Sequence, residues 1–262
     1  MQQANPSQPA GNFDAAYYAT GCGAEYVRND FWLSFFDGIA GHIIDDIAPA
    51  TVLDAGCAKG FLVEQLRRRG TPAWGVDISD YAISQAHDSI RTFCSVGSIA
   101  APFERRYDLI TCIEVVEHMP ALEAARAIEN LCAHSDDILF SSSPHDYAEV
   151  THINVQPAEY WAEVFARHGF FHDLSFNATF ITPWAIRFRR SSAPVHRIVR
   201  DYERHLSLLR EENHQLRQAA QQQRNTGAIA DLTRERDALR DLVARYEQGR
   251  FMRFMRWLKG AR

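Results

Sequence analysis

Short apolar runs alternate with amphipathic segments through the first 190 residues of the chain. Apolar runs bounded by turn residues are typical of buried strands, whereas apolar residues spaced three and four apart are typical of helices. Strand-like runs occur at 51–53, 73–76, 91–94, 107–113, 138–140, 170–176 and 184–188. Strands that alternate with helices predict an α/β fold with a doubly wound, mostly parallel sheet that helices cover on both faces.

Two of the predicted helices have clear start signals. Asn29 and Asp30 form a cap ahead of an apolar stripe that ends before Pro49. That stripe consists of Trp32, Phe36, Ile39, Ile43 and Ile47. Pro157 is expected at the first position of a later helix, where its missing N–H has no helical partner in any case, and Gly169 ends that helix.

A carboxylate and a turn of small residues follow the first predicted strand. Asp54 ends the strand, Gly56, Ala58 and Gly60 make the turn, and a helix opens at Phe61. Small side chains let the backbone approach a ligand, and the helix start offers free N–H groups to a polar head. A dinucleotide-binding fingerprint has a third glycine at the position of Phe61, so this turn departs from that fingerprint.

A second acid, Asp77, ends the next predicted strand, where a carboxylate reaches the hydroxyls of a ribose. Three features together resemble the motifs of class I S-adenosylmethionine (SAM)-dependent methyltransferases: the turn at 54–60, this second acid, and strand 107–113 with the segment 114–118 after it. The resemblance covers about residues 26–190 and implies a seven-stranded Rossmann-like sheet with an antiparallel hairpin at its edge. It implies SAM as the cofactor, bound by Asp54, Gly56, Ala58, Gly60, Asp77, Ile78, Ser98, Ile113, Glu114 and Tyr26.

One part of the implied cofactor site departs from the family pattern, and the role of another part has two interpretations. Ser98 stands where the family commonly has an acid that contacts adenine, so that contact is weaker here or comes from the backbone. The aromatic segment 17–28 is similar to one that folds over the cofactor in related methyltransferases, which makes Tyr18, Tyr26 and Arg28 candidate lid residues. The alternative is that these aromatic residues only tie the N-terminal arm to the core.

Three histidines fall in loops at the carboxyl ends of the predicted strands, where doubly wound sheets place their sites. The methyl group of SAM is already activated, so catalysis requires positioning of the acceptor and, for a hydroxyl, a general base. We expect His152 to be this base, because segment 151–157 resembles the acceptor-side loop of sugar and small-molecule methyltransferases. His118 is the second candidate and His145, beside Asp146, the third; each is otherwise a solvated or capping loop residue.

A metal site is not predicted. The spacing Glu114-x-x-Glu117-His118 superficially resembles a zincin helix, but its first position is not histidine. The sequence places no matching third ligand next to it.

Composition and charge narrow the class of protein. Residues 193–262 carry 15 Arg and Lys against 9 Asp and Glu, so a basic tail follows an acidic globular part, which argues against a nucleic-acid substrate. Residues 1–25 are expected to be a flexible arm, and its polar start at 1–9 does not have the pattern of a signal peptide. No apolar run is long enough to span a membrane. The five cysteines form no CxxC pair, which indicates reduced thiols in a cytoplasmic protein.

The C-terminal part has a heptad pattern. Apolar positions four and three apart define a seam with Asn213 in a core position, which favours a coiled coil over 191–249 and a homo-oligomer. The seam consists of Val195, Val199, Tyr202, Leu206, Leu209, Asn213, Leu216 and Ala220. The segment 225–227 is expected to interrupt it, and the alternative is a solvated helix or a hairpin packed on its own domain. Residues 250–262 form a basic amphipathic tail suited to anionic lipid, to a groove of a partner, or to self-docking.

These features predict a SAM-dependent methyltransferase. The run 179–190 and the coiled coil are similar to bacterial methyltransferases associated with surface-polysaccharide glycosyltransferases. That resemblance implies O-methylation of a sugar hydroxyl in cell-surface glycan biosynthesis, in the cytoplasm or at the inner face of the membrane, with a glycosyltransferase as a possible partner. The alternatives are a methyltransferase of a quinone precursor or another lipid-soluble hydroxyl compound, and a non-catalytic assembly factor that keeps its coil as a spacer.

Overall fold

The computed structural model of the chain describes residues 13–21 and 25–247, with side chains described as far as residue 242. The chain divides into two units, Met1–Ala193 and Pro194–Arg262. The first unit contains α1 (Ala15–Thr20), α2 (Asp30–His42), the π-helical η1 (Ile43–Ile47), β1 (Val52–Ala55), α3 (Phe61–Arg68), β2 (Ala73–Asp77), α4 (Asp80–Ser84), η2 (Arg91–Phe93), β3 (Cys94–Val96), β4 (Leu109–Ile113), η3 (Val116–His118), α5 (Ala121–His134), β5 (Asp137–Ser141), α6 (Ala158–Arg167), β6 (Phe170–His172) and β7 (Ile186–Arg190). The second unit contains α7 (Val195–Glu247).

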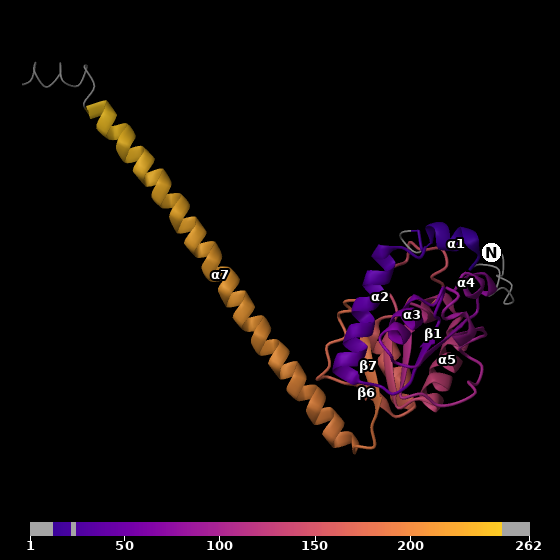
Figure 1. The fold of residues 1–262 in the computed structure, drawn as a ribbon. Coiled ribbons are helices and arrows are strands. Elements are labelled where there is room, and N and C mark those ends of the chain that lie inside the picture. Colours follow the sequence, from indigo (N-terminus) through magenta and orange to yellow (C-terminus); the bar gives the residue numbers. More distant parts are fainter. Residues whose placement is uncertain (1–12, 22–24, 248–262) are drawn as a thin grey trace, which may run out of the picture. The chain divides into compact units, whose positions relative to one another are not determined.

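The strands of the first unit form one seven-stranded sheet in the order β3-β2-β1-β4-β5-β7-β6 (Figure 1). The neighbouring pairs from β3 to β5 are parallel, and β7 runs antiparallel to both β5 and β6. The strand order reverses between β1 and β4, and such a switch point leaves a crevice at the carboxyl ends of the strands. The predicted mostly parallel sheet with an antiparallel hairpin at its edge is confirmed.

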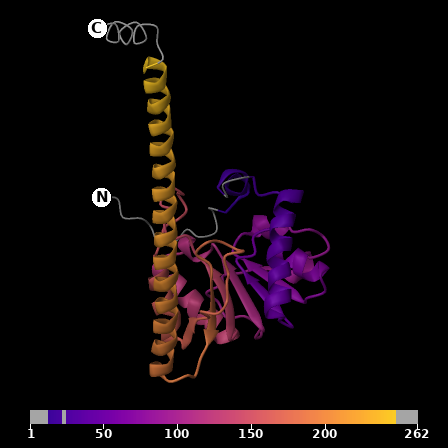
Figure 2. The same cartoon turned by 90° about the vertical axis from the view of Figure 1, so that its left-hand side faces the viewer.

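Helices cover both faces of this sheet, as the sequence predicts (Figures 1 and 2). In β5, Ile138 and Phe140 enter a core with α5 and α6, whereas the intervening Leu139 enters a core with α2 and α3. This alternation follows from strand geometry, because successive side chains point to opposite faces. The Asn29 side chain caps α2 by accepting from the Trp32 N–H at 3.0 Å.

Several predicted boundaries need correction. Residues 91–93 form a 3-10 turn, so β3 starts only at Cys94. β6 ends at His172, because the next residue, Asp173, turns the chain and accepts hydrogen bonds from the backbone N–H and hydroxyl of Ser175. β7 starts at Ile186 instead of Trp184, and Pro157 caps α6 instead of occupying its first turn.

The predicted flexible arm is wrong for residues 13–21. Asp14 caps α1 by accepting from two backbone N–H groups, and the side chain of Tyr18 is 5% exposed. Tyr18 packs with Tyr26 and Phe61 in a small third core. Tertiary contacts therefore hold a helix that is too short to be stable by itself.

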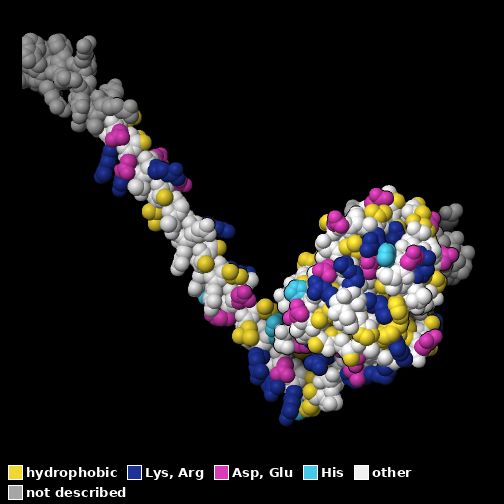
Figure 3. All heavy atoms as spheres, viewed as in Figure 1, with side chains coloured by type: hydrophobic (Ala, Val, Ile, Leu, Met, Phe, Trp, Pro, Cys, Tyr) yellow, Lys and Arg dark blue, Asp and Glu magenta, His cyan; other side chains and the backbone are white. Residues whose placement is uncertain are grey.

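The described part of the second unit is one continuous helix of 53 residues. The predicted interruption at 225–227 is wrong, because the helix runs through Gly227; an interior glycine costs only about 1 kcal/mol of helix stability. Figure 3 shows apolar side chains along this helix among charged ones, and Leu206, Leu209 and Leu216 are 39%, 48% and 63% exposed. Pairing of this helix with a second copy stays a prediction, and the predicted tail at 250–262 lies outside the described residues. Among the described residues, no helix is apolar over a stretch long enough to span a membrane.

Candidate functional site

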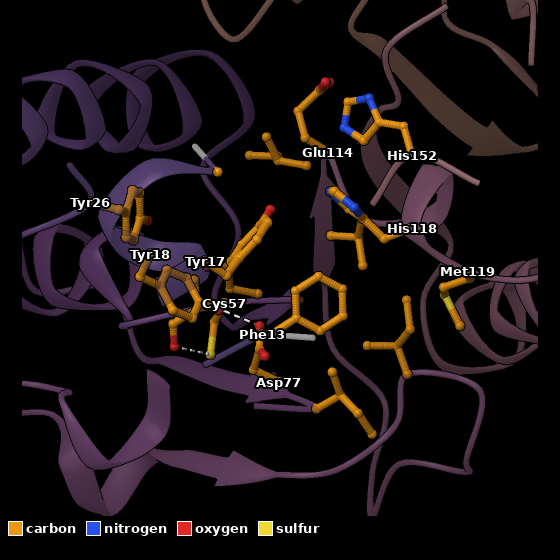
Figure 4. Close-up of a pocket in the computed structure, with 18 of the residues that line it drawn as sticks. Phe13, Tyr17, Tyr18, Tyr26, Cys57, Asp77, Glu114, His118, Met119 and His152 are labelled. Carbon is orange, nitrogen blue, oxygen red and sulfur yellow. Dashed lines mark hydrogen bonds between the residues drawn. The ribbon is translucent and has the colours of Figure 1, made fainter. Parts of the chain in front are cut away.

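A cavity of about 530 Å³ opens at the carboxyl ends of β1, β2 and β4, where the strand order reverses. Its volume is in the usual range for small-molecule sites. Figure 4 shows Asp77 and Cys57 on one side of the cavity, His118 and His152 on the other, and Tyr17 and Phe13 between them. Eleven of the thirteen predicted site residues line this cavity: Tyr26, Asp54, Gly56, Ala58, Asp77, Ile78, Ser98, Ile113, Glu114, His118 and His152.

The turn after β1 brings its backbone against the second acid. Gly56 adopts a φ of +90°, and a Cβ there would lie 2.3 Å from a methyl group of Val115, so only glycine fits. Ala58 adopts a left-handed φ of +48° and donates its N–H to Asp77 Oδ2 at 2.7 Å. Gly60 is not among the residues that line the cavity; it starts α3 with a φ of +76°.

Burial perturbs both acids of the turn. Asp54 is buried, which raises its pKa to about 7; the Thr111 hydroxyl opposes this by donating to Oδ1 at 2.7 Å, and the nearby Asp77 adds to it. Burial also raises the pKa of Asp77, against the stabilising backbone N–H groups of Ser79 and Ala58. Each Asp77 oxygen accepts one backbone hydrogen bond and retains further acceptor capacity.

The aromatic segment before α2 both lines the cavity and anchors the chain. Phe13 and Tyr17 contact the ring of His118 edge-on, and the Phe13 carbonyl accepts from the Ser79 hydroxyl at 2.6 Å. The Tyr26 carbonyl accepts from the buried Lys59 ammonium at 2.6 Å. Arg28, the third candidate lid residue, is instead an anchor, because its guanidinium forms two hydrogen bonds with Glu64 of α3.

The two candidate bases that line the cavity lie side by side. The rings of His118 and His152 have centroids 4.7 Å apart. Burial, and then the neighbouring His152, lower the pKa of His118 to about 4, so this imidazole is neutral at pH 7. His145 lies on an exposed part of the same loop and is not among the residues that line the cavity.

Glu117 lies directly before His118, behind the wall of the cavity, and no functional role was predicted for it from the sequence. Its side chain is 0% exposed, Oε1 accepts from the Ser143 N–H at 3.1 Å, and Oε2 has no hydrogen-bond partner. Burial, and then the nearby Glu114, raise its pKa to about 8. The only sequence signal was its place in the segment 114–118, and nothing in that segment indicates that β4, η3 and the loop after β5 surround it.

Glu117, His118 and His152 form a cluster that we call the Glu-His-His cluster. One ligand-type atom from each residue lies within 4.8 Å of the other two. A carboxylate with two imidazoles is a common donor set for divalent metal ions. The third ligand that the sequence does not place next to Glu117-His118 thus comes from the loop after β5.

The buried acid makes a stability prediction. The unfolded chain releases the Glu117 proton above about pH 4.5, whereas the folded protein keeps it up to about pH 8, so the contribution of this group to stability falls as pH rises between these values. Glu117→Gln removes this loss of stability, because an amide does not ionise. In the presence of a chelator we expect its free energy of unfolding to exceed that of the wild type by about 2–4 kcal/mol at pH 8.

Urea unfolding at pH 5 and pH 8, followed by tryptophan fluorescence, measures this difference. The gain should be small at pH 5 and grow toward pH 8. An equal difference at both pH values would contradict the raised pKa, and Glu159→Gln, on the exposed start of α6, is the control.

The sheet order and the acids at the ends of β1 and β2 define a class I SAM-dependent methyltransferase domain. Residues 30–173, more than half of the chain, match the family of methyltransferase domains. The chain belongs to this family.

Curated relatives match only part of the chain. The ubiquinone biosynthesis O-methyltransferase of Nitrosomonas europaea is 32% identical over 100 residues, which are 35% of this chain and 41% of that protein. The enzyme of the same name from Acinetobacter baumannii is 29% identical over 124 residues, 44% of this chain and 51% of that protein. The matched segments thus span about half of these relatives or less.

Solved structures share the fold. Magnesium protoporphyrin IX methyltransferase from Synechocystis, with bound SAM, is 18% identical with a TM-score of 0.54, over 72% of this chain and 100% of that one. CalS10, an amino pentose methyltransferase from Micromonospora echinaspora, is 14% identical with a TM-score of 0.50, over 72% of this chain and 100% of that one. At these identities the likeness concerns the fold alone.

Proposed function

We propose that the protein transfers the methyl group of SAM to a hydroxyl oxygen of a glycan sugar. The observation that carries this proposal is the shared cavity. Asp54 and Asp77 lie at the ends of β1 and β2, and His118 and His152 line the opposite wall. A cofactor and a hydroxyl acceptor bound in this one cavity would meet between the two walls.

The cofactor would follow the first two strands. Asp77 would accept from the ribose hydroxyls of SAM, and the turn 56–60, where small residues expose the backbone, would hold its amino-acid end. Segment 97–99 would border the adenine, with Ser98 as a polar but uncharged neighbour. This arrangement also argues against a non-catalytic assembly factor, because a scaffold has no need for two buried acids of raised pKa.

The reaction needs a deprotonated oxygen in line with the sulfonium. The acceptor hydroxyl transfers its proton to His152, the oxygen forms a bond to the methyl carbon, and the sulfur–carbon bond breaks. Its electron pair stays on sulfur, which leaves neutral S-adenosylhomocysteine. His152 is oriented for this role, because its Nδ1 lies 2.9 Å from the Asp146 carbonyl and its Nε2 is left for the acceptor.

The polar residues around His152 favour a sugar as the acceptor. Glu123, Asp146 and Glu149 line the cavity together with the rings of Phe13 and Tyr17. Carboxylates accept hydrogen bonds from sugar hydroxyls, and aromatic rings offer an apolar surface to the C–H face of a pyranose.

A phenolic hydroxyl is the second candidate. The relatives from Nitrosomonas europaea and Acinetobacter baumannii are named for ubiquinone biosynthesis, and the same aromatic rings that would pack on a sugar also suit a planar acceptor. A quinone precursor of this kind would be lipid-soluble.

Radiolabelled methyl transfer to cell-envelope extracts tests both candidates. Label in the polysaccharide fraction supports a sugar acceptor, and label in the solvent-extracted lipid fraction supports the phenolic one. Calorimetry with SAM provides the control for cofactor binding. Absence of SAM binding would contradict the proposal and favour the assembly factor.

The exposed seam of α7 adds a proposal on oligomers. We infer that two copies pair through this helix in parallel, because Val199, Leu206, Asn213 and Ala220 recur every seven residues and a lone Asn at such a position specifies register and dimers. Contact of the basic segment 250–262 with anionic lipid or with a glycosyltransferase stays a proposal. Vesicle flotation with and without this segment tests the contact with lipid.

The seam makes a direct prediction. Leu209→Glu places a charge in the seam and should halve the mass measured by sedimentation, whereas Leu208→Glu, on the adjacent face of the same turn, should not. Both leucines are exposed in the single chain, at 48% and 63%, so neither change should affect the folding of a monomer. An equal mass for the two variants would remove the seam as the interface.

A further inference from the structure

We propose that the Glu-His-His cluster binds a divalent transition-metal ion beside the acceptor oxygen. This inference rests on the proposed function for the role of the ion, but the site itself follows from the geometry of Glu117, His118 and His152 alone. No metal was predicted from the sequence, since the third ligand comes from a distant loop.

The spacing of the three groups suits one ion. Their ligand atoms lie within 4.8 Å of one another, whereas ligands at metal bonds of about 2.0–2.2 Å stand roughly 3–3.5 Å apart in tetrahedral or cis positions. Small side-chain rotations therefore bring them into coordination. Glu117 and His118 come from η3 after β4, and His152 comes from the loop after β5.

The backbone holds these two segments together without help from a metal. The buried Asn154 donates its backbone N–H to the Glu117 carbonyl at 2.9 Å and its side-chain N–H to the Val116 carbonyl at 3.2 Å. His152 is two residues away from this clamp. The donor set is thus held in position by hydrogen bonds outside it, which is the usual arrangement around a bound metal.

Both imidazoles have their Nδ1 atoms engaged outside the cluster. His152 Nδ1 lies 2.9 Å from the Asp146 carbonyl, which can only accept, so this nitrogen carries the proton. His118 Nδ1 lies 2.9 Å from the Thr151 hydroxyl and 3.3 Å from the Thr151 carbonyl. A proton on each Nδ1 leaves the Nε2 lone pairs free, and an Nδ1–H bound to a carbonyl is typical of metal-ligating histidines.

The third ligand is a buried carboxylate that lacks a compensating partner. Glu117 Oε2 has no hydrogen bond, and among the residues with described side chains no Lys, Arg or His forms an ion pair with Glu117. Burial denies this oxygen the hydrogen bonds that water would supply, which is costly for a polar atom. A divalent cation would give Oε2 the partner that it lacks.

The donor set selects the class of ion. Two imidazole nitrogens favour Mn²⁺, Fe²⁺, Co²⁺ or Zn²⁺ over Mg²⁺ and Ca²⁺, which prefer oxygen ligands. Three protein ligands leave coordination positions open, and two of the three, His118 and His152, line the cavity. An acceptor hydroxyl bound there would lose its proton to water near neutral pH, so the ion would replace His152 as the activating group and His152 would act as its ligand.

Cobalt binding tests the site with a readout independent of activity. Full-length protein freed of metal is titrated with CoCl₂ and followed by visible absorption and equilibrium dialysis, with ZnCl₂ as competitor and MgCl₂ as comparison. We expect one Co²⁺ per chain, displaced by Zn²⁺ and not by Mg²⁺. Glu117→Gln and His152→Ala should each weaken binding at least tenfold, whereas His145→Ala, on the exposed part of the same loop, should not.

Each outcome separates this inference from the proposed function. Absence of Co²⁺ binding, or binding that survives both cluster substitutions, overturns the metal site. Glu117→Gln is expected to fold because the amide has nearly the same shape as the buried acid that it replaces, and His152→Ala supplies an independent ligand variant; calorimetry with SAM verifies both. Co²⁺ binding without SAM binding would keep the metal site and overturn the methyltransferase proposal, whereas methyl transfer unchanged by chelation, with no Co²⁺ bound, would do the reverse.

Discussion

Replacing His152 with alanine should lower methyl-transfer turnover by about 10²–10³-fold while the dissociation constant of SAM changes less than about threefold. Loss of a general base has an effect of this size, and loss of a metal ligand that activates the same hydroxyl is expected to act at the same step. The His152 side chain is only 10% exposed and lies on the wall opposite Asp77, so its removal leaves the cofactor contacts in place.

Single-turnover rates with labelled SAM, together with calorimetry, measure the two quantities separately. His145→Ala is the matched control, because this exposed histidine of the same loop does not line the cavity. His118→Ala should also reduce turnover at least tenfold. Wild-type turnover in both the His152 and His118 variants would remove the imidazole pair from the reaction.

Asp77→Ala should weaken SAM binding by about 10²-fold. A carboxylate that accepts hydrogen bonds from two ribose hydroxyls contributes roughly 1.5–3 kcal/mol for each bond, and part of this is offset by the cost of keeping the acid buried. The substitution also releases the N–H groups of Ala58 and Ser79, which loosens the turn that faces the amino-acid end of the cofactor.

Asp77→Asn separates these two effects. Its remaining carbonyl oxygen can accept from Ala58 or Ser79 but carries no charge, so its affinity for SAM should lie between those of the wild type and Asp77→Ala. Asp80→Asn, three residues on and exposed at the start of α4, is the control and should bind SAM as the wild type does. Calorimetry gives all four constants, and an unchanged constant for Asp77→Ala would sink the cofactor placement.

Local sequence patterns were reliable where an element buries a full face. The strands β1, β4 and β5 are nearly continuous apolar runs because helices cover both sides of the sheet. The predictions were poorer at the edges, where β3 and β6 have only three residues each. So short a strand has too few positions to show a period, and turn residues such as Asp173 decide where it ends.

The predictions for the shortest and the longest helix, α1 and α7, were wrong for opposite reasons. α1 has six residues and no helical period of its own, yet the rings of Tyr26 and Phe61 hold Tyr18 in place. In α7, the sequence around Gly227 predicted an interruption of the helix. One unfavourable residue does not end a helix that has good helix formers on both sides.

The sequence by itself determined the alternation of strands and helices, the two acids at the ends of β1 and β2, and the turn of small residues between them. These features are local, since a strand end, its acid and the following helix start are contiguous in the chain. Only the tertiary structure decided that His152, from the loop after β5, lies beside Glu117 and His118. The reason is that η3 and the segment around Asn154 meet through hydrogen bonds between residues far apart in sequence. Local periodicity carries no record of such a pairing, so the Glu-His-His cluster could be found only once the chain was folded.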